Sequence, residues 1–320
     1  MRRRLAARLG QSIIVVFIVT TITFFVVRAV PGDPFAYDSP RITPAVRAQL
    51  RAQFGYDKPI VAQYGLYLWN AAHGRFGYSP LRHDTVASVL AQAIPRTLAL
   101  AGLGLLLSFV FGIVIGTAQA ARRGGWFDRA TSFVLLFIYS LPDFWAALII
   151  LLAFAYWWRV LPSGGIVDPV MHDYMSPGRA LADRLAHLIL PLGSLVLLTV
   201  AGISRYQRTA MLEVLPADYV RSARAKGVPE SQVVWRHALR TALAPVIALL
   251  GVMLPAMLGG TVFVEQVFSW PGMGMLAARS IRDRDYDLVT GIVVVGSVLV
   301  ILGNLLADLL HAAVDPRVRE

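Results

Sequence analysis

Cysteine is absent from this 320-residue chain, so disulfide bonds, thiolate metal ligands and cysteine nucleophiles are excluded. Charge is scarce as well: 15% of the residues are charged, whereas 57% are hydrophobic and the mean hydropathy is +0.61. Soluble domains of this size are less apolar. The net charge of +11 does not indicate a nucleic-acid partner, because the basic residues separate apolar runs instead of forming one patch. These observations indicate a membrane protein.

Sequence motifs for catalysis are missing too. The chain has two lysines, Lys58 and Lys226, and neither belongs to the G-x-x-x-x-G-K-[ST] loop that binds nucleotide phosphates. Its six histidines have no H-E-x-x-H or other ligand spacing. His73, His83 and Asp84 share one loop, which leaves a metal site there as an alternative. We expect no catalytic residue, no bound metal and no cofactor, and this chain should not hydrolyse ATP by itself.

Six charge-poor stretches are long enough to cross a membrane, since a helix needs about 20 residues for a hydrocarbon core of about 30 Å. They are Leu9–Val27, Thr97–Ala121, Ala130–Trp158, Leu185–Ser204, Thr241–Val264 and Leu288–Ala307. The first follows a run of arginines and resembles a signal peptide, but no small-x-small cleavage site comes after Val27. We therefore predict an all-α membrane protein with six transmembrane helices, the first of them retained.

The distribution of basic residues predicts the orientation of these helices, because short cytoplasmic loops are enriched in lysine and arginine. One side of the membrane would hold residues 1–8, 122–129, 205–240 and 311–320, with 16 basic residues and a net charge of +10. The segments on the other side have a net charge of +4, all of it in the long segment 28–96. Both termini and the segment 205–240 are therefore expected in the cytoplasm.

The longest polar interruption of the C-terminal half, Met211–Pro245, has the pattern of two short helices joined by a turn. Asp218 suits the first turn of the first helix, and Lys226 suits its last turn. Gly227 suits the left-handed residue that ends a helix, and Pro229 suits the first turn of the next one. A helix of about nine residues is marginal alone in water, so we expect the bilayer surface or another protein to hold it.

The residues of this first helix and turn, DYVRSARAKG, resemble the cytoplasmic EAA loop of ABC-importer permeases, in the version of the dipeptide/oligopeptide/nickel-type subfamily. The glutamate that names the loop is replaced by Arg221, and this subfamily commonly has an arginine there. In the family the first short helix is the coupling helix, which docks in a cleft of a separate ATPase subunit. The resemblance implies that the coupling residues are Asp218, Tyr219, Arg221, Ala223, Arg224, Ala225, Lys226 and Gly227.

Weaker motifs extend the resemblance over essentially the whole chain. RAVPGDP, FGYDKPI and HGRFGYS occur in the family's order near the N-terminus, where we also predict one helix over Pro44–Phe54 and another from Pro59 to His73. Glu265–Gly274 resembles the family's E-x-x-F-S-W-P-G-x-G turn, and NLLAD followed by DPRVR resembles its C-terminal end.

The resemblance implies a type I ABC importer permease fold with a cytoplasmic coupling helix, placed in the cell inner membrane. The expected parts are residues 1–96 with the first span and a periplasmic segment, a permease core over 97–310, and a cytoplasmic tail over 311–320. The expected partners are a second homologous permease subunit, two ATPase subunits that bind ATP, an extracytoplasmic solute-binding protein and the lipid bilayer. The expected solute is a peptide or a similar small molecule; dipeptides, oligopeptides, nickel chelates and glutathione remain open.

Two acidic residues are candidates for the substrate pathway. Asp143 follows Pro142 inside the third span, where we expect the proline to kink the helix and to free a backbone carbonyl that lipid cannot satisfy. A carboxylate inside the membrane costs about 2.5–3.5 kcal/mol on insertion and is therefore a functional candidate; pairing with a neighbouring subunit is the alternative role of Asp143. Glu265 is the second candidate, and stabilisation of packing at the outer interface is its alternative role.

A self-contained secondary transporter, driven by protons through Asp143, Glu265 and Asp308, is the alternative function. Carriers of this kind usually show internal repeats with broken helices at matching positions. This sequence shows no such repeat, and a carrier would not need the long basic segment 205–240. The importer subunit is therefore the favoured interpretation.

The predicted topology can be tested by labelling. The substitutions Ser39→Cys and Ser222→Cys should each provide the single thiol of the chain, because the natural sequence has no cysteine. A membrane-impermeant thiol reagent should then reach the two positions from opposite sides of the membrane. Labelling of both positions from the same side would contradict the topology.

Overall fold

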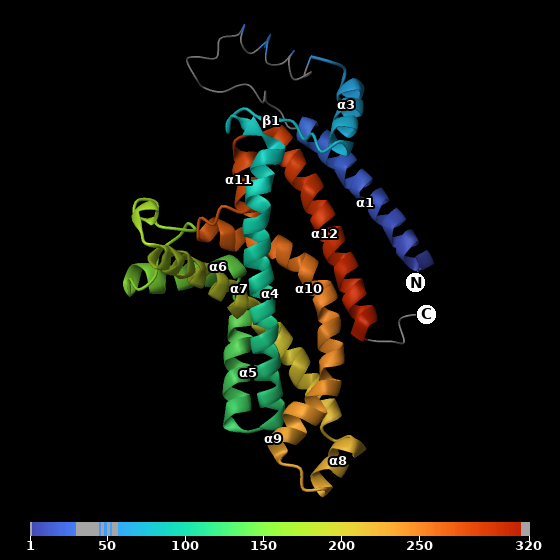
Figure 1. The fold of residues 1–320 in the computed structure, drawn as a ribbon, viewed down its shortest axis with the longest axis vertical. Coiled ribbons are helices and arrows are strands. Elements are labelled where there is room, and N and C mark those ends of the chain that lie inside the picture. The colour runs from blue at the N-terminus through green and yellow to red at the C-terminus, as the bar shows by residue number, and fades with distance from the viewer. Residues whose placement is uncertain (1, 30–44, 46–47, 50–51, 53–56, 315–320) are drawn as a thin grey trace. The chain divides into compact units, whose positions relative to one another are not determined.

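The structure is a computed structural model that describes residues 2–29, 45, 48–49, 52 and 57–314 (Figure 1). The predicted helix Pro44–Phe54 falls mostly outside the described residues, as do most of the RAVPGDP motif and the DPRVR ending. The chain divides into two compact units. Unit 1 comprises Met1–Pro95 with Leu276–Leu299, and unit 2 comprises Arg96–Met275 with Val300–Glu320.

Helices make up most of the described chain. In chain order they are α1 (Arg2–Ala29), α3 (Ile60–Ala72), α4 (Val86–Ala121), α5 (Trp126–Tyr139), α6 (Asp143–Leu151), α7 (Pro177–Val214), α8 (Asp218–Ala225), α9 (Glu230–Gln232), α10 (Leu239–Val267), α11 (Met273–Arg282) and α12 (Tyr286–Val314). Two π-helical segments, Leu152–Trp157 and Val233–Ala238, extend α6 and join α9 to α10, and His172–Tyr174 is a 3-10 turn. The strands β1 (Tyr78–Ser79) and β2 (Asp84–Thr85) form an antiparallel pair in which Tyr78 lies opposite Thr85.

Each predicted span coincides with a helix or a helix pair. Among the described residues, five helices are long and apolar enough to cross a membrane, and the bent pair of α5 and α6 gives a sixth span if it crosses as one. The predicted helix from Pro59 to His73 is also present, since α3 begins directly after Pro59 and has His73 as its C-cap. The prediction of an all-α membrane protein is therefore confirmed.

The third span is broken at Pro142. The α5 and α6 helices differ in direction by 105°. Proline has no N–H and disfavours the helical conformation of the residue before it, so Leu141 and Pro142 leave the helix. The backbone oxygen of Leu136, at the end of α5, accepts both the Ser140 N–H at 3.1 Å and the Ser140 hydroxyl at 2.8 Å. The sequence predicted a kink within one helix, and that prediction underestimated the change in direction.

Unit 1 is held by contacts of α3 with α1 and of the β1–β2 pair with the start of α12. Phe24 of α1 packs against Tyr64 of α3, with the ring centroids 5.4 Å apart. The Ser79 hydroxyl donates to the buried carboxylate of Asp285. The other carboxylate oxygen of Asp285 accepts the Leu288 N–H at 3.2 Å, which caps α12.

In unit 2, α7 packs against α5 and α10, and α4 comes close to α7 at Gly112 and Gly116. Gly112 and Gly116 have the small-x-x-x-small spacing that occurs at close helix contacts and also incidentally in membrane helices. A Cβ atom at Gly112 would lie 2.6 Å from Cγ2 of Ile203, and one at Gly116 would overlap the backbone oxygen of Ser204. The spacing therefore serves packing here, because larger residues would push the two helices apart.

Because of this close approach, replacing glycine with alanine should change the stability of the protein differently at two positions of α4. Gly116→Ala should lower the free energy of unfolding by about 1–3 kcal/mol, because the added methyl group overpacks the contact with α7. Gly102→Ala should leave stability unchanged or raise it, because nothing lies within 4 Å of a Cβ atom there and alanine favours a helix. Thermal unfolding of the detergent-solubilised protein measures both. Equal effects would contradict a packing role for Gly116.

Candidate functional site

The predicted helix–glycine–helix segment is present in unit 2. Its first helix, α8, has Asp218 in the first turn, and Gly227 has a left-handed φ of +77°. The Gly227 N–H donates to the Arg224 oxygen at 3.0 Å, and the Val228 N–H donates to the Ala223 oxygen at 3.2 Å. These two bonds form a Schellman motif, which ends a helix and favours glycine at the left-handed position. The predicted turn at Gly227 is confirmed.

One apolar side chain, Val220, holds α8 against the rest of unit 2. It is fully buried in a hydrophobic cluster with Ala120, Ala210, Met211, Val233, Val234, Ala238 and Ala242. Ala223 packs against the same cluster. We expected the bilayer surface or another protein to hold this short helix, and that expectation was incomplete, because the chain's own core already holds it. In the sequence, this attachment was indicated by a single valine, Val220, among charged neighbours.

The charges of α8 form two ion pairs of different character. Arg224 donates from Nε and Nη2 to the Glu230 carboxylate at 3.0 and 2.8 Å, and from Nη1 to the Leu215 oxygen at 3.3 Å. The hydrogen bonds to Glu230 raise the pKa of Arg224 above its usual value. Arg221 pairs with Asp218 one turn away, where both side chains are exposed, and such a pair contributes little stability. Arg224 thus connects α8 to both flanking segments.

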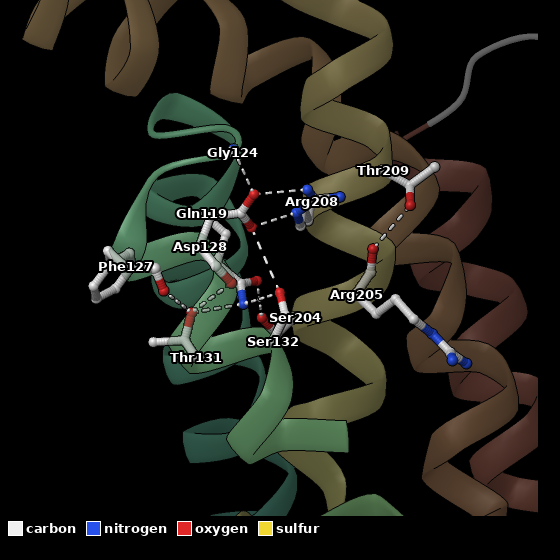
Figure 2. A network of polar contacts seen from close by, with 10 residues as sticks. All are labelled: Gln119, Gly124, Phe127, Asp128, Thr131, Ser132, Ser204, Arg205, Arg208 and Thr209. Atoms are coloured by element: carbon white, nitrogen blue, oxygen red, sulfur yellow. Dashed lines mark hydrogen bonds and ion pairs between the residues drawn. The ribbon is translucent and has the colours of Figure 1, made fainter. Parts of the chain in front are cut away.

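A second polar cluster lies where α4, α5 and α7 meet (Figure 2). The buried carboxylate of Asp128 accepts hydrogen bonds from Arg208, from Nε at 2.7 Å and from Nη2 at 2.8 Å. It also accepts the Gly124 N–H at 2.9 Å. Gln119 accepts a hydrogen bond from Ser204 Oγ at 2.9 Å and donates to a threonine of α5 at 2.9 Å. Sequence reasoning missed this cluster, because Asp128 and Arg208 are 80 residues apart in the chain.

The two candidate pathway residues have different surroundings. Asp143 is exposed at the start of α6, directly after the break in the third span. Glu265 is fully buried and accepts hydrogen bonds from Thr97 Oγ1 at 2.7 Å and from the N–H groups of Gly274 and Met275 at 2.7 and 3.0 Å. These two N–H groups belong to the first turn of α11, where helix N–H groups have no partner within the helix. Within the described parts of the chain, no group of three or more histidine and acidic side chains could hold a metal ion.

Known proteins similar to this chain match it along nearly its whole length. Residues 87–320 match the family described as "Binding-protein-dependent transport system inner membrane component", and residues 1–101 match the corresponding N-terminal family. The oligopeptide transport system permease protein AppB of Bacillus subtilis is 38% identical over 310 residues, which cover 96% of each chain. The dipeptide transport system permease protein DppB of Escherichia coli K12 is 36% identical over 329 residues, which cover 98% of this chain and 97% of DppB.

A solved structure shares the fold. It is an inward-facing conformation of the MetNI methionine ABC transporter, matched with a TM-score of 0.53 and 21% sequence identity. The match covers 71% of this chain and 96% of the other. It confirms the predicted type I importer permease fold and, at this identity, concerns the fold alone.

Replacing aspartate with asparagine should reduce stability more in the buried pair Asp128–Arg208 than in the exposed pair Asp218–Arg221. Asp128→Asn leaves the Arg208 guanidinium without an anionic partner at a largely buried contact, and should lower the free energy of unfolding by about 3 kcal/mol. Asp218→Asn removes an exposed pair and should cost less than about 1 kcal/mol. Thermal unfolding of both variants in detergent measures the difference. A similar loss in the two variants would show that burial does not strengthen the Asp128–Arg208 contact.

Proposed function

The chain belongs to the family of binding-protein-dependent transport system inner membrane components, and from this we propose that it moves peptides into the cytoplasm as the permease subunit of an ABC importer. The observation that carries the peptide assignment is identity of 36–38% over nearly the full length of two permeases named for oligopeptides and dipeptides. The same comparisons support an importer subunit and give no support to a self-contained carrier driven by protons.

We propose that the chain works in a complex of defined composition. The family implies an ATPase and a solute-binding protein as partners, and the sequence has no phosphate-binding loop of its own. Six spans provide half of a pathway, so a second homologous permease subunit would complete it, and two ATPase copies would match the two permeases. In such a complex this chain conducts the solute and does not catalyse a reaction.

We propose that both termini and α8 face the cytoplasm, and that α8 is the coupling helix. The excess of basic residues in the segments 1–8, 122–129 and 205–240 supports this orientation. The exposed side of α8 carries Tyr219, Arg221, Ala225 and the following Lys226, so these residues would contact the ATPase. Val220 and Ala223 face the chain's own cluster and would set the position of that exposed side.

The two acidic candidates receive separate roles in this proposal. Asp143 is exposed beside a break in a membrane span, where irregular backbone occurs next to protein or water and not next to lipid. It therefore remains our candidate for contact with the solute. Glu265 has hydrogen-bond donors from α4 and α11 around its buried carboxylate, so we assign it to holding the turn between α10 and α11.

The coupling role predicts loss of transport from Ala223→Glu and from Gly227→Val. Glutamate at Ala223 would place a charge against the hydrophobic cluster that positions α8. Valine at Gly227 would oppose the left-handed turn, at a cost of about 1 kcal/mol or more. Both variants should still insert in the membrane. In proteoliposomes that contain the complete transporter, peptide uptake should be abolished, and ATP hydrolysis should no longer be coupled to transport.

The matched control for these variants is Arg221→Ala. Its side chain is exposed, and a single exposed ion pair with the ATPase would contribute little, so uptake should change little. Normal uptake and normal stimulation of ATP hydrolysis in an Ala223→Glu, Gly227→Val double mutant would show that α8 is only a surface helix. Absence of peptide uptake by the complete wild-type transporter would refute the peptide assignment.

A further inference from the structure

A partly open cavity of about 310 Å³ lies between α5 and α7 in unit 2. Leu135, Leu136 and Gly202 form part of its apolar wall, and Tyr139, Arg205 and Arg208 are among its polar side chains. Sites for small molecules usually have volumes of about 300–1,000 Å³, with mostly apolar walls and a few polar groups. The cavity therefore suits a small ligand that has both an apolar part and a polar part.

One positive charge in the cavity, that of Arg205, has no acidic partner in the part of the chain that the structure describes. Arg208 is paired with Asp128, whereas the Arg205 side chain points away from Asp128 (Figure 2). The guanidinium carbon of Arg205 lies 5.6 Å from the ring centroid of Tyr139. Among the described residues, no carboxylate lies within ion-pair distance of Arg205. A cation–π contact attracts the guanidinium but leaves its charge in place, so the cavity favours an anion.

The depth of Arg205 shows which kind of anion can reach it. At about 1.5 Å per residue, Tyr139 lies about 20 Å along α5 from Trp126 at the start of the helix. The headgroup layer on each side of a bilayer is only about 5–8 Å thick. With the segment 122–129 in the cytoplasm, as proposed above, this distance places the guanidinium beside the Tyr139 ring deeper than the lipid phosphates. Arg205 then belongs to the membrane-spanning part of α7, and the cytoplasmic segment predicted from the sequence begins after it. Charged side chains at such depth face a water-filled cavity or a binding partner.

We propose that Arg205 binds a carboxylate group of the transported solute in this cavity. The proposal rests on the proposed function, because a peptide carries a free C-terminal carboxylate beside a side chain that the leucine wall can contact. A guanidinium binds a carboxylate through two parallel N–H···O bonds, which fix its orientation as well as its position. Arg205 would thus hold the carboxyl end of the solute near the break between α5 and α6.

The test compares a peptide with its uncharged analogue. The full chain, assembled with its partner subunits but without the solute-binding protein, is placed in nanodiscs of neutral phosphatidylcholine. Saturation-transfer NMR then measures binding of alanyl-phenylalanine and of alanyl-phenylalaninamide, which lacks the carboxylate. The wild type should bind the free acid about 10-fold or more tightly than the amide, because a hydrogen-bonded ion pair is lost with the amide.

Variants assign this preference to Arg205. Arg205→Gln should abolish the preference for the free acid, and Arg205→Lys should retain part of it. Arg123→Gln removes an equal charge from an exposed loop position next to the same helices and should keep the full preference. Equal binding of acid and amide by the wild type would overturn the proposal without any variant, and so would an unchanged preference in Arg205→Gln.

Two further measurements separate this proposal from its alternatives. Native mass spectrometry after addition of phosphatidylglycerol tests whether the cavity is a lipid site. Two results together would assign the cavity to lipid and overturn the proposal: the wild type binds acid and amide equally, and the Arg205→Gln variant loses the bound lipid. Uptake by the complete wild-type transporter tests the proposed function. Peptide uptake without a carboxylate preference would refute the site alone, and a carboxylate preference without peptide uptake would refute the peptide transport function alone.

Discussion

Lipid offers no hydrogen-bond partner to the backbone, and this constraint governs the structure of the chain. Each backbone N–H and C=O group in the hydrocarbon layer must be satisfied within the protein, so the spans are helices, and the strands among the described residues are two residues long. Helices in lipid also associate without the usual hydrophobic driving force, and they depend on close packing instead. Gly112 and Gly116 meet that need by letting α4 approach α7.

The close approach of α4 and α7 also explains the buried polar contacts near the C-terminal end of α4. Gln119 lies three residues beyond Gly116, so the spacing that Gly116 permits brings its amide within 2.9 Å of Ser204 Oγ. The Asp128–Arg208 contact joins α5 to α7 in the same cluster. The buried polar groups of this cluster are therefore satisfied by hydrogen bonds within the protein, and the small residues between α4 and α7 set the distance between the two helices. Packing and polar satisfaction are therefore mutually dependent in this part of unit 2.

Signals confined to a few neighbouring residues were predictable from the sequence, and pairings between distant segments were not. Apolar runs located the spans, and Gly227 marked the end of α8 because few other residues tolerate its φ of +77°. Pro142 located the irregularity in the third span, but the angle of 105° depends on the packing of α6 against α7 and α10. The partners of Arg208 and Arg224 depend on tertiary structure, since a single sequence does not show which carboxylate each arginine will meet.

The attachment of α8 has a mechanical consequence. Val220 sits in a cluster with residues of both α7 and α10, Arg224 is bonded to the segments before and after the helix, and the Tyr219 hydroxyl donates to Thr241 at 2.9 Å. From these contacts we expect α8 to move together with α7 and α10 and not to slide independently of them. A push on its exposed side would exert torque on α7 and α10 together, and the stiffness of that linkage would depend on the packing of Val220 and on the bonds of Tyr219 and Arg224.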